Sequence, residues 1–171
     1  MDKFKLSPIL QFLLLLIPVD IYVIGEWVGS GIQWVLFRYI VVDNQSALIV
    51  LPSEVVLVLN GTINGQRTVF SEIFWFFGAC LLLLAFLSIA FSYVKRENKL
   101  LKQGALIDAG AGIFFLIALF IQYGFALHGP AGFVIPIGLP ILFIIAYWLY
   151  RESGRSDDEE TAHEKESEMI S

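Results

Sequence analysis

Four long apolar stretches, separated by shorter polar ones, dominate the pattern of this chain. A helix rises about 1.5 Å per residue, so an apolar run of about 18 residues or more is long enough to cross the hydrocarbon core of a bilayer. The pattern therefore predicts a membrane protein of mainly α class, built as a four-transmembrane-helix bundle. The predicted spans are residues 7–28, 71–94, 104–127 and 131–150.

The first run has a second interpretation as a signal peptide, with Lys3 and Lys5 in front of a leucine-rich core. The run continues past Pro18, and no small-residue cleavage site follows the leucines. A transmembrane helix fits this pattern better.

Residues 29–70 have a different sequence pattern from the spans, because short runs of β-branched and aromatic residues alternate with turn residues. Such runs are typical of strands, and the Asn-Gly pair at Asn64 is typical of a hairpin turn. We therefore expect a small antiparallel β-sheet in the first outer loop. A further membrane helix over 32–51 is the alternative, which Arg38 and Asp43 oppose. The predicted strands are residues 33–42, 47–51, 54–59 and 66–70.

The basic residues decide the predicted orientation, because positive loops stay on the cytoplasmic side. Nine of the 11 lysines and arginines fall on the side of the 95–103 loop, and only Arg38 and Arg67 fall on the other side. We expect a plasma-membrane protein with both termini cytoplasmic. The remaining segments are the N-terminus 1–6, the outer loop 29–70, the basic cytoplasmic loop 95–103, the outer turn 128–130 and the tail 151–171.

The tail and the overall composition add limits. Eight of the 16 acids lie in 151–171, which lacks aromatic residues, and this pattern predicts a disordered acidic tail. Only 16% of the residues are charged, and 57% are hydrophobic. No basic face with interleaved aromatics indicates nucleic-acid binding. The single cysteine, Cys80, excludes paired-cysteine chemistry, and no motif for a metal or other cofactor is present.

One acid within a predicted span indicates a candidate polar pocket. Asp20 follows Pro18 in the first span, and a carboxylate there is costly unless it faces the bundle or a wet cavity. Gln122 lies at a similar predicted depth, and His128 lies just beyond it. Pro136 predicts a bend nearby. We expect Asp20, Gln122 and His128 to line this pocket, and a structural hydrogen bond of Asp20 is the alternative.

Smaller motifs complete the candidate residues. Asn44 and Asn60 head two Asn-x-Ser/Thr sequons in the predicted outer loop, where they are either glycosylated or ordinary turn asparagines. The small-residue pairs are Gly25 with Gly29 and Ser88 with Ser92. Such pairs let helices approach closely, and we expect packing within the chain.

These patterns favour a non-catalytic accessory or structural subunit that presents its outer β-module to another membrane or surface protein. The alternative is a channel or transporter component that uses the Asp20 pocket and forms homo-oligomers. An enzyme acting on lipid or peptide at the outer face is a third hypothesis, which needs Ser30, His128 or an acid pair to converge.

Overall fold

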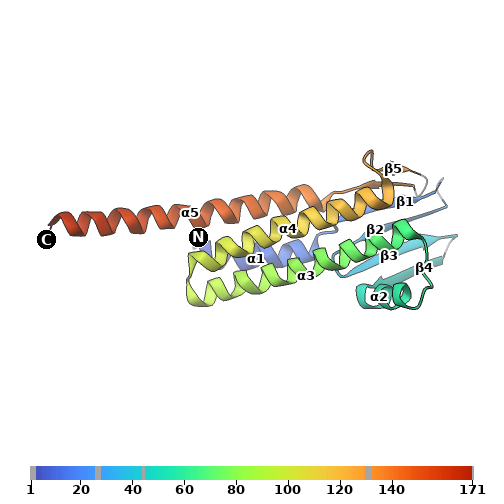
Figure 1. Ribbon diagram of the computed structural model, residues 1–171, viewed down its shortest axis with the longest axis horizontal. Helices are drawn as coiled ribbons and strands as arrows, with labels where there is room; N and C mark the ends of the chain where they lie inside the picture. The colour runs from blue at the N-terminus through green and yellow to red at the C-terminus, as the bar shows by residue number, and fades with distance from the viewer. Residues whose placement is uncertain (1–2, 26–27, 44, 130–131, 171) are drawn as a thin grey trace.

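In the computed structural model the long helices run side by side, and an antiparallel sheet extends from one end of them (Figure 1). The structure describes residues 3–25, 28–43, 45–129 and 132–170. The helices are α1 (Lys3–Leu16), α2 (Leu51–Leu59), α3 (Gln66–Lys95), α4 (Asn98–Tyr123) and α5 (Gly138–Ile170). The strands are β1 (Asp20–Ile24), β2 (Gly29–Gln33), β3 (Phe37–Val42), β4 (Gln45–Val50), β5 (His128–Gly129) and β6 (Gly132–Ile135).

The helices α3 and α4 are each long and apolar enough to cross a membrane. Such helices are typical of membrane proteins, although the core helix of a soluble protein passes the same test of length and composition. They pack closely because small residues meet large ones. A side chain at Gly78 would come within 2.9 Å of Phe115, and one at Gly104 within 2.5 Å of Ile89. The protein is mostly helical with a small antiparallel sheet, and this part of the predicted fold class is confirmed.

The first and last predicted spans are only partly helical. The predicted helix over 7–28 is wrong beyond its first half, because α1 ends at Leu16 and Asp20–Ile24 forms β1. Pro18 has no backbone N–H for a continuing helix, and the β-branched residues after it favour a strand. At the other end, residues 132–135 form β6, and α5 begins only after Pro136.

Two further expectations are corrected by the helices. Residues 54–59 and 66–70 were predicted as strands, but the first lies in α2 and the second begins α3. Pro52 sits in the first turn of α2, where a missing N–H is tolerated. The tail was predicted to be disordered, but α5 continues through it to Ile170. Its Glu, Lys, Arg and Ala residues have high helix propensity.

The sheet brings together segments that are far apart in the sequence. Its strand order is β4-β3-β2-β1-β6-β5, with every neighbouring pair antiparallel. β1 to β4 follow one another as a meander after α1, whereas β5 and β6 come from the segment between α4 and α5. β1 comes from the first predicted span and β6 from the last, so parts of two predicted spans pair with each other within the sheet.

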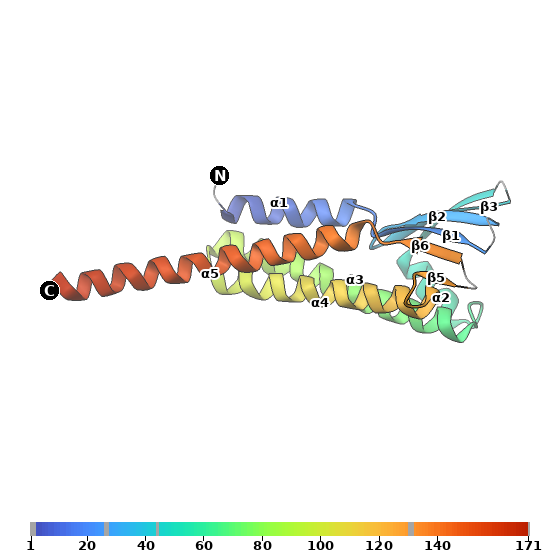
Figure 2. The ribbon, with the colours of Figure 1, turned by 90° about the horizontal axis from the view of Figure 1, so that it is seen from above.

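The sheet has one covered and one open side. In Figure 2, α2 and the neighbouring part of α3 lie on one side of the sheet, here called the inner side. Neighbours along a strand point to opposite sides, and directly paired residues share a side. Asp20 and Tyr22 are buried on the inner side, whereas Ile21 between them is exposed on the outer side.

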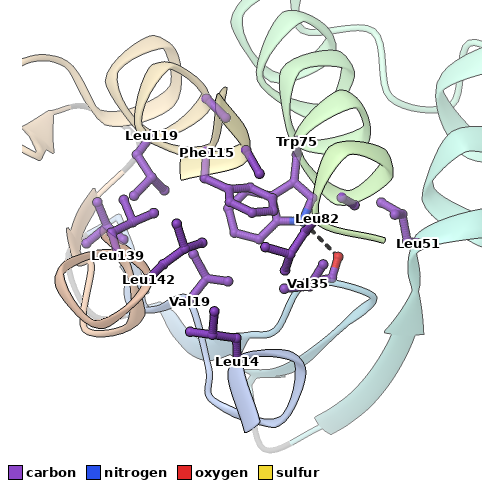
Figure 3. Close-up of a cluster of buried hydrophobic side chains, with 14 of the residues drawn as sticks. Leu14, Val19, Val35, Leu51, Trp75, Leu82, Phe115, Leu119, Leu139 and Leu142 are labelled. Atoms are coloured by element: carbon purple, nitrogen blue, oxygen red, sulfur yellow. Dashed lines mark hydrogen bonds between the residues drawn. The ribbon is translucent and has the colours of Figure 1, made fainter. Parts of the chain in front are cut away.

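The main hydrophobic core lies where the sheet meets the helices (Figure 3). The ring of Trp75 packs on Phe115, with 4.8 Å between the ring centroids. The indole nitrogen of Trp75 donates a hydrogen bond of 3.3 Å to the carbonyl of Val35, in the turn between β2 and β3. This contact fixes the sheet against α3.

Candidate functional site

A row of polar side chains crosses the inner side of the sheet on three adjacent strands. Asp20 of β1 is paired in register with Gln33 of β2, and Gln33 is paired with Arg38 of β3. Paired residues share a side, so all three face the helices. The strand register, rather than sequence proximity, brings these groups together.

Arg38 is the centre of a buried ion-pair network. Its Nε contacts Glu54 of α2, and its Nη1 donates to Oε1 of Glu72 on α3 at 3.2 Å. Burial lowers the pKa of Arg38, but the two carboxylates outweigh that effect and raise it above its ordinary value. Arg38 therefore stays charged and ties the sheet to two helices.

Asp20 is the most isolated group of this network. Asp20 is only 1% exposed, and neither of its carboxylate oxygens has a hydrogen-bond partner within the described residues. Burial raises the pKa of Asp20 from 3.8 to about 8, which Arg38 opposes and Glu72 reinforces. The carboxyl is consequently protonated over a wide pH range in which an exposed aspartate is charged.

Two neighbours share this environment. Burial, and then the carboxylate of Glu72, raise the pKa of Glu54 above its ordinary value. Burial also raises the pKa of Tyr22 to about 12, so its hydroxyl keeps its proton. The ring of Tyr22 lies over Gly31, where any side chain would approach within 2.4 Å of it. Gly31 thus leaves room for the tyrosine on the inner side.

A small polar cavity of about 50 Å³ lies beside Arg38. Side chains of the sheet and of the sheet-side ends of α3 and α4 form its wall. The lining residues are Gln33, Arg38, Thr68, Ser71, Glu72, Trp75, Leu119, Gln122 and Tyr123. Asp20 is not among them but lies opposite Gln33 in the sheet. A cavity of this size holds a few water molecules or one small ion.

The predicted pocket residues are not all brought together. Gln122 lines the cavity, and Asp20 interacts electrostatically with Arg38 and Glu72 of its wall. His128 lies elsewhere, because it pairs with Phe133 on the outer side and its ring stacks on that phenylalanine with 6.5 Å between centroids. Including His128 in the pocket was wrong, because the β6 register turns it away.

The strand register also separates Ser30 from His128. Ser30 pairs with Val23, Val23 with Phe133, and Phe133 with His128, so Ser30 and His128 are three strand steps apart. At about 4.8 Å per step the separation is about 14 Å, far beyond hydrogen-bond reach.

The remaining predicted residues fall in several places. Gly25 and Gly29 do not form a helix-packing motif, because they lie at the turn after β1 and in β2. The hydroxyl of Ser88 donates to the carbonyl of Leu100 at 2.9 Å, which links α3 to α4. The hydroxyl of Ser92 donates to the carbonyl of Glu97 at 3.0 Å, between the two helices. Exposed Asn60 ends α2, and Asn44 lies outside the described residues.

Sequence reasoning missed Arg38, Glu54 and Glu72 as one network, because each belongs to a different element. It also missed a polar pair deeper among the helices. The Nε2 of Gln11 donates to Oδ1 of Asp108 at 2.6 Å, and both residues are fully buried. Spacing along the chain gives no sign of a contact between residues this far apart.

The outer side of the sheet presents the opposite chemistry. The row of paired residues Ile135, Ile21, Ile32, Tyr39 and Leu48 runs across five strands. Leu48 is 64% exposed and Ile135 52% exposed. Together with Phe37 and Val50 this row forms the outer apolar face. The outward positions of the five longer strands include no Asp, Glu, Lys or Arg: Ile21, Val23, Ser30, Ile32, Phe37, Tyr39, Val41, Ser46, Leu48, Val50, Phe133 and Ile135.

Trp34 connects this face to the first helix. Its ring stacks on Phe37 with 4.8 Å between centroids, and its indole nitrogen donates to the carbonyl of Leu16 at 3.0 Å. Apolar residues of α1, among them Phe12 and Leu16, are exposed as well.

Comparison with the models of known protein families found no match, and comparison with curated proteins found none of significant similarity.

Proposed function

We propose that this chain is a small multi-pass membrane protein of non-catalytic type, an accessory subunit that binds another membrane protein through the outer apolar face. The observation that carries the proposal is the five-strand row of large apolar side chains that no described element covers. Contiguous exposed apolar surface in a protein marks an interaction site.

The proposed topology rests on the arrangement of the helices. α1, α3, α4 and the first part of α5 run side by side, and the sheet lies beyond the ends of α1 and α5, next to the end portions of α3 and α4 (Figure 2). The connection between α3 and α4, with Lys95 and Arg96, lies at the opposite end, as does the start of α1 with Lys5 (Figure 1). Basic residues at that end support a cytoplasmic location in the plasma membrane for it and an outer location for the sheet.

The helices also carry exposed apolar side chains that suit a lipid environment. Among them are Phe77, Leu84 and Phe91 of α3 and Ile113 of α4, each about half exposed. Lipid satisfies these side chains in the bilayer. It does not satisfy the outer apolar face, because the strands extend beyond the ends of α1 and α5 (Figure 2).

A membrane protein fits this face better than a soluble one. The face continues through Trp34 onto α1, and α1 is only 14 residues long, about 21 Å at the helical rise. A partner that covers both the sheet and α1 would need one surface outside the bilayer and another within it. A multi-pass protein with its own outer domain has that shape.

The test is the composition of the particle purified from native membranes in a mild detergent. The wild type is expected to carry a second protein in fixed ratio. Leu48→Glu should release that protein while the chain still elutes as a folded species, because its side chain is solvent-facing. Thr62→Glu, an exposed change at the same end but away from the face, is the matched control.

Two results would overturn the proposal. A particle that contains only this chain, as a monomer, leaves the face without a partner. A homo-oligomer that survives Leu48→Glu favours the alternative of a channel or transporter component. That alternative has weaker structural support, because every buried residue of α4 between Asp108 and Gln122 is apolar or glycine.

A further inference from the structure

The inner side of the sheet holds more buried carboxyl groups than its neighbouring cation could balance if all of them were ionised. The carboxyl groups of Asp20, Glu54 and Glu72 surround the guanidinium of Arg38. The hydroxyls of Tyr22 and Tyr123 face the same group from β1 and α4. Uncompensated charge in a dry site is costly, so the cluster must take up protons or another cation.

Several oxygens of the cluster lack hydrogen-bond partners within the described residues. They are both carboxylate oxygens of Asp20, Oε2 of Glu72, Oε1 of Gln122 and the hydroxyl of Tyr22. The hydroxyl of Tyr22 can also donate a hydrogen bond. The amide oxygen and the ionised carboxylate oxygens can only accept one. Buried polar groups are normally satisfied, so this excess of acceptors requires donors or a positive ion.

The cavity beside Arg38 is where such an ion would fit. Glu72 and Gln122 belong to its wall, together with the hydroxyl-bearing Thr68 and Tyr123. Its volume of about 50 Å³ accommodates an ion with one or two waters and excludes a bulky organic cation. Hard cations prefer oxygen ligands of this kind.

We propose that this cavity binds a small monovalent inorganic cation of the sodium or potassium class, held by the carboxylate of Glu72 and the amide oxygen of Gln122. In the described chain no group of three or more His, Cys, Asp or Glu side chains could hold a metal ion. That finding speaks against a zinc-type or calcium-type site. An alkali ion needs fewer charged ligands, because neutral oxygens and water complete its shell.

Protons compete with the ion for the same negative charge. Burial raises the pKa of Asp20 to about 8, and Glu54 is shifted in the same direction. Protonation removes negative charge around Arg38 and Glu72, so the cation binds more tightly as the pH rises toward 8. Binding should in turn release protons from the cluster.

The first experiment uses the full-length wild type in detergent and compares thermal unfolding in sodium, potassium and choline chloride at equal ionic strength and pH 8. Alkali chlorides should raise Tm above the value in choline chloride, because choline is too large for the cavity. Sodium NMR line broadening then gives the affinity directly. The difference between sodium and choline should shrink at lower pH.

The second experiment uses Gln122→Leu, which removes one cavity oxygen without changing the charge of the cluster. Sodium affinity should fall by about tenfold or more, a loss of the size seen when groups supporting a metal site are removed. Gln103→Leu, at an exposed glutamine of the same helix, should bind sodium like the wild type.

The proposal is overturned if the wild type has equal Tm values in alkali and choline chloride and shows no sodium line broadening. The cavity would then hold only water and protons. If a folded Gln122→Leu variant binds sodium with unchanged affinity, the assignment of Gln122 as a ligand is wrong. The site is independent of the outer apolar face, so neither result bears on partner binding.

Discussion

The two sides of the sheet differ from those of an ordinary solvated sheet, because the charged residues lie among the apolar core residues of the covered side and not on the open side. The covered inner side carries Asp20, Gln33 and Arg38, whereas the open outer side carries a row of isoleucine, tyrosine and leucine side chains. Antiparallel sheets with one solvated face normally place apolar residues inside and polar residues outside. Here the charged network binds the sheet to the helices, and the apolar surface remains available.

The contrast indicates that the two sides serve separate purposes. An apolar inner side would hold the sheet with less desolvation cost than an ion-pair network, so the buried charges are better explained by specific docking or by ligand binding than by stability. An apolar outer side lowers solubility unless another surface covers it. The following changes separate these roles.

The largest effect is expected from Arg38→Met. This change leaves Glu54 and Glu72 without their cation, and breaking a buried pair in this way typically costs about 3–5 kcal/mol of unfolding free energy. Thermal unfolding in detergent, followed by circular dichroism, measures the loss. The triple variant Arg38→Met/Glu54→Gln/Glu72→Gln should recover much of it. Exposed Arg67→Met is the control, and an equal loss there would contradict the network.

On the outer side, position within the face should set the size of the effect. Ile32→Glu, at the centre of the five-strand row, should cost about 2 kcal/mol or more of partner binding, as central anchors do. Ser46→Glu, away from that row on β4, should cost much less. Co-purification yield or titration with the isolated partner measures both. Equal losses would show that the row is not the interface.

The pH dependence of stability should report Asp20. An exposed aspartate in the unfolded chain titrates near 3.8, and the folded one near 8. Between these values the folded state holds the additional proton, so the free energy of unfolding falls as the pH rises, by up to about 1.4 kcal/mol per pH unit. Above pH 8 this contribution levels off.

The Asp20→Asn variant removes this titration, and its stability should decline less steeply over the same interval. Chemical unfolding at several pH values in choline chloride measures the slope without interference from alkali ions. Asp43→Asn, at an exposed acid in the turn after β3, should keep the wild-type slope. A wild-type slope in Asp20→Asn would assign the titration to another group.

The smallest effect is expected from His128→Ala. The residue is exposed on the outer side and stacks only on Phe133, so the unfolding free energy should change by less than about 0.5 kcal/mol. Sodium affinity of the inner cavity should not change at all. A tenfold change in sodium affinity would contradict the structure, because the sheet register separates His128 from the cavity.

Sequence patterns alone predict a mostly helical protein with a small antiparallel sheet and long apolar helices. The apolar runs at 71–94 and 104–127 correspond to α3 and α4, whose length and composition alone suit a membrane. The basic loop 95–103 predicted the connection between α3 and α4, and the predicted strands 33–42 and 47–51 correspond to β3 and β4. These features are local, because hydropathy, charge and turn propensity can be read within a few residues of each other.

Contacts between distant segments explain why the first and last runs contain strands and not only helix. Asp20–Ile24 and Gly132–Ile135 are apolar enough for a membrane helix, and they become strands because they pair with each other across more than 100 residues of sequence. Val-rich Glu54–Leu59 changes in the opposite direction, from a predicted strand to a helix that packs on α3. In both cases tertiary contacts select between conformations that the local sequence leaves open.

The same distinction applies to the sites. The sequence marked Asp20 and Gln122, since a charge or amide in an apolar run is visible on its own. It could not show that Arg38 would meet Glu54 and Glu72, or that His128 would point away, because each depends on strand register. A shift of one residue in that register would exchange the two sides of the sheet. The buried network and the outer apolar face are therefore properties of the fold.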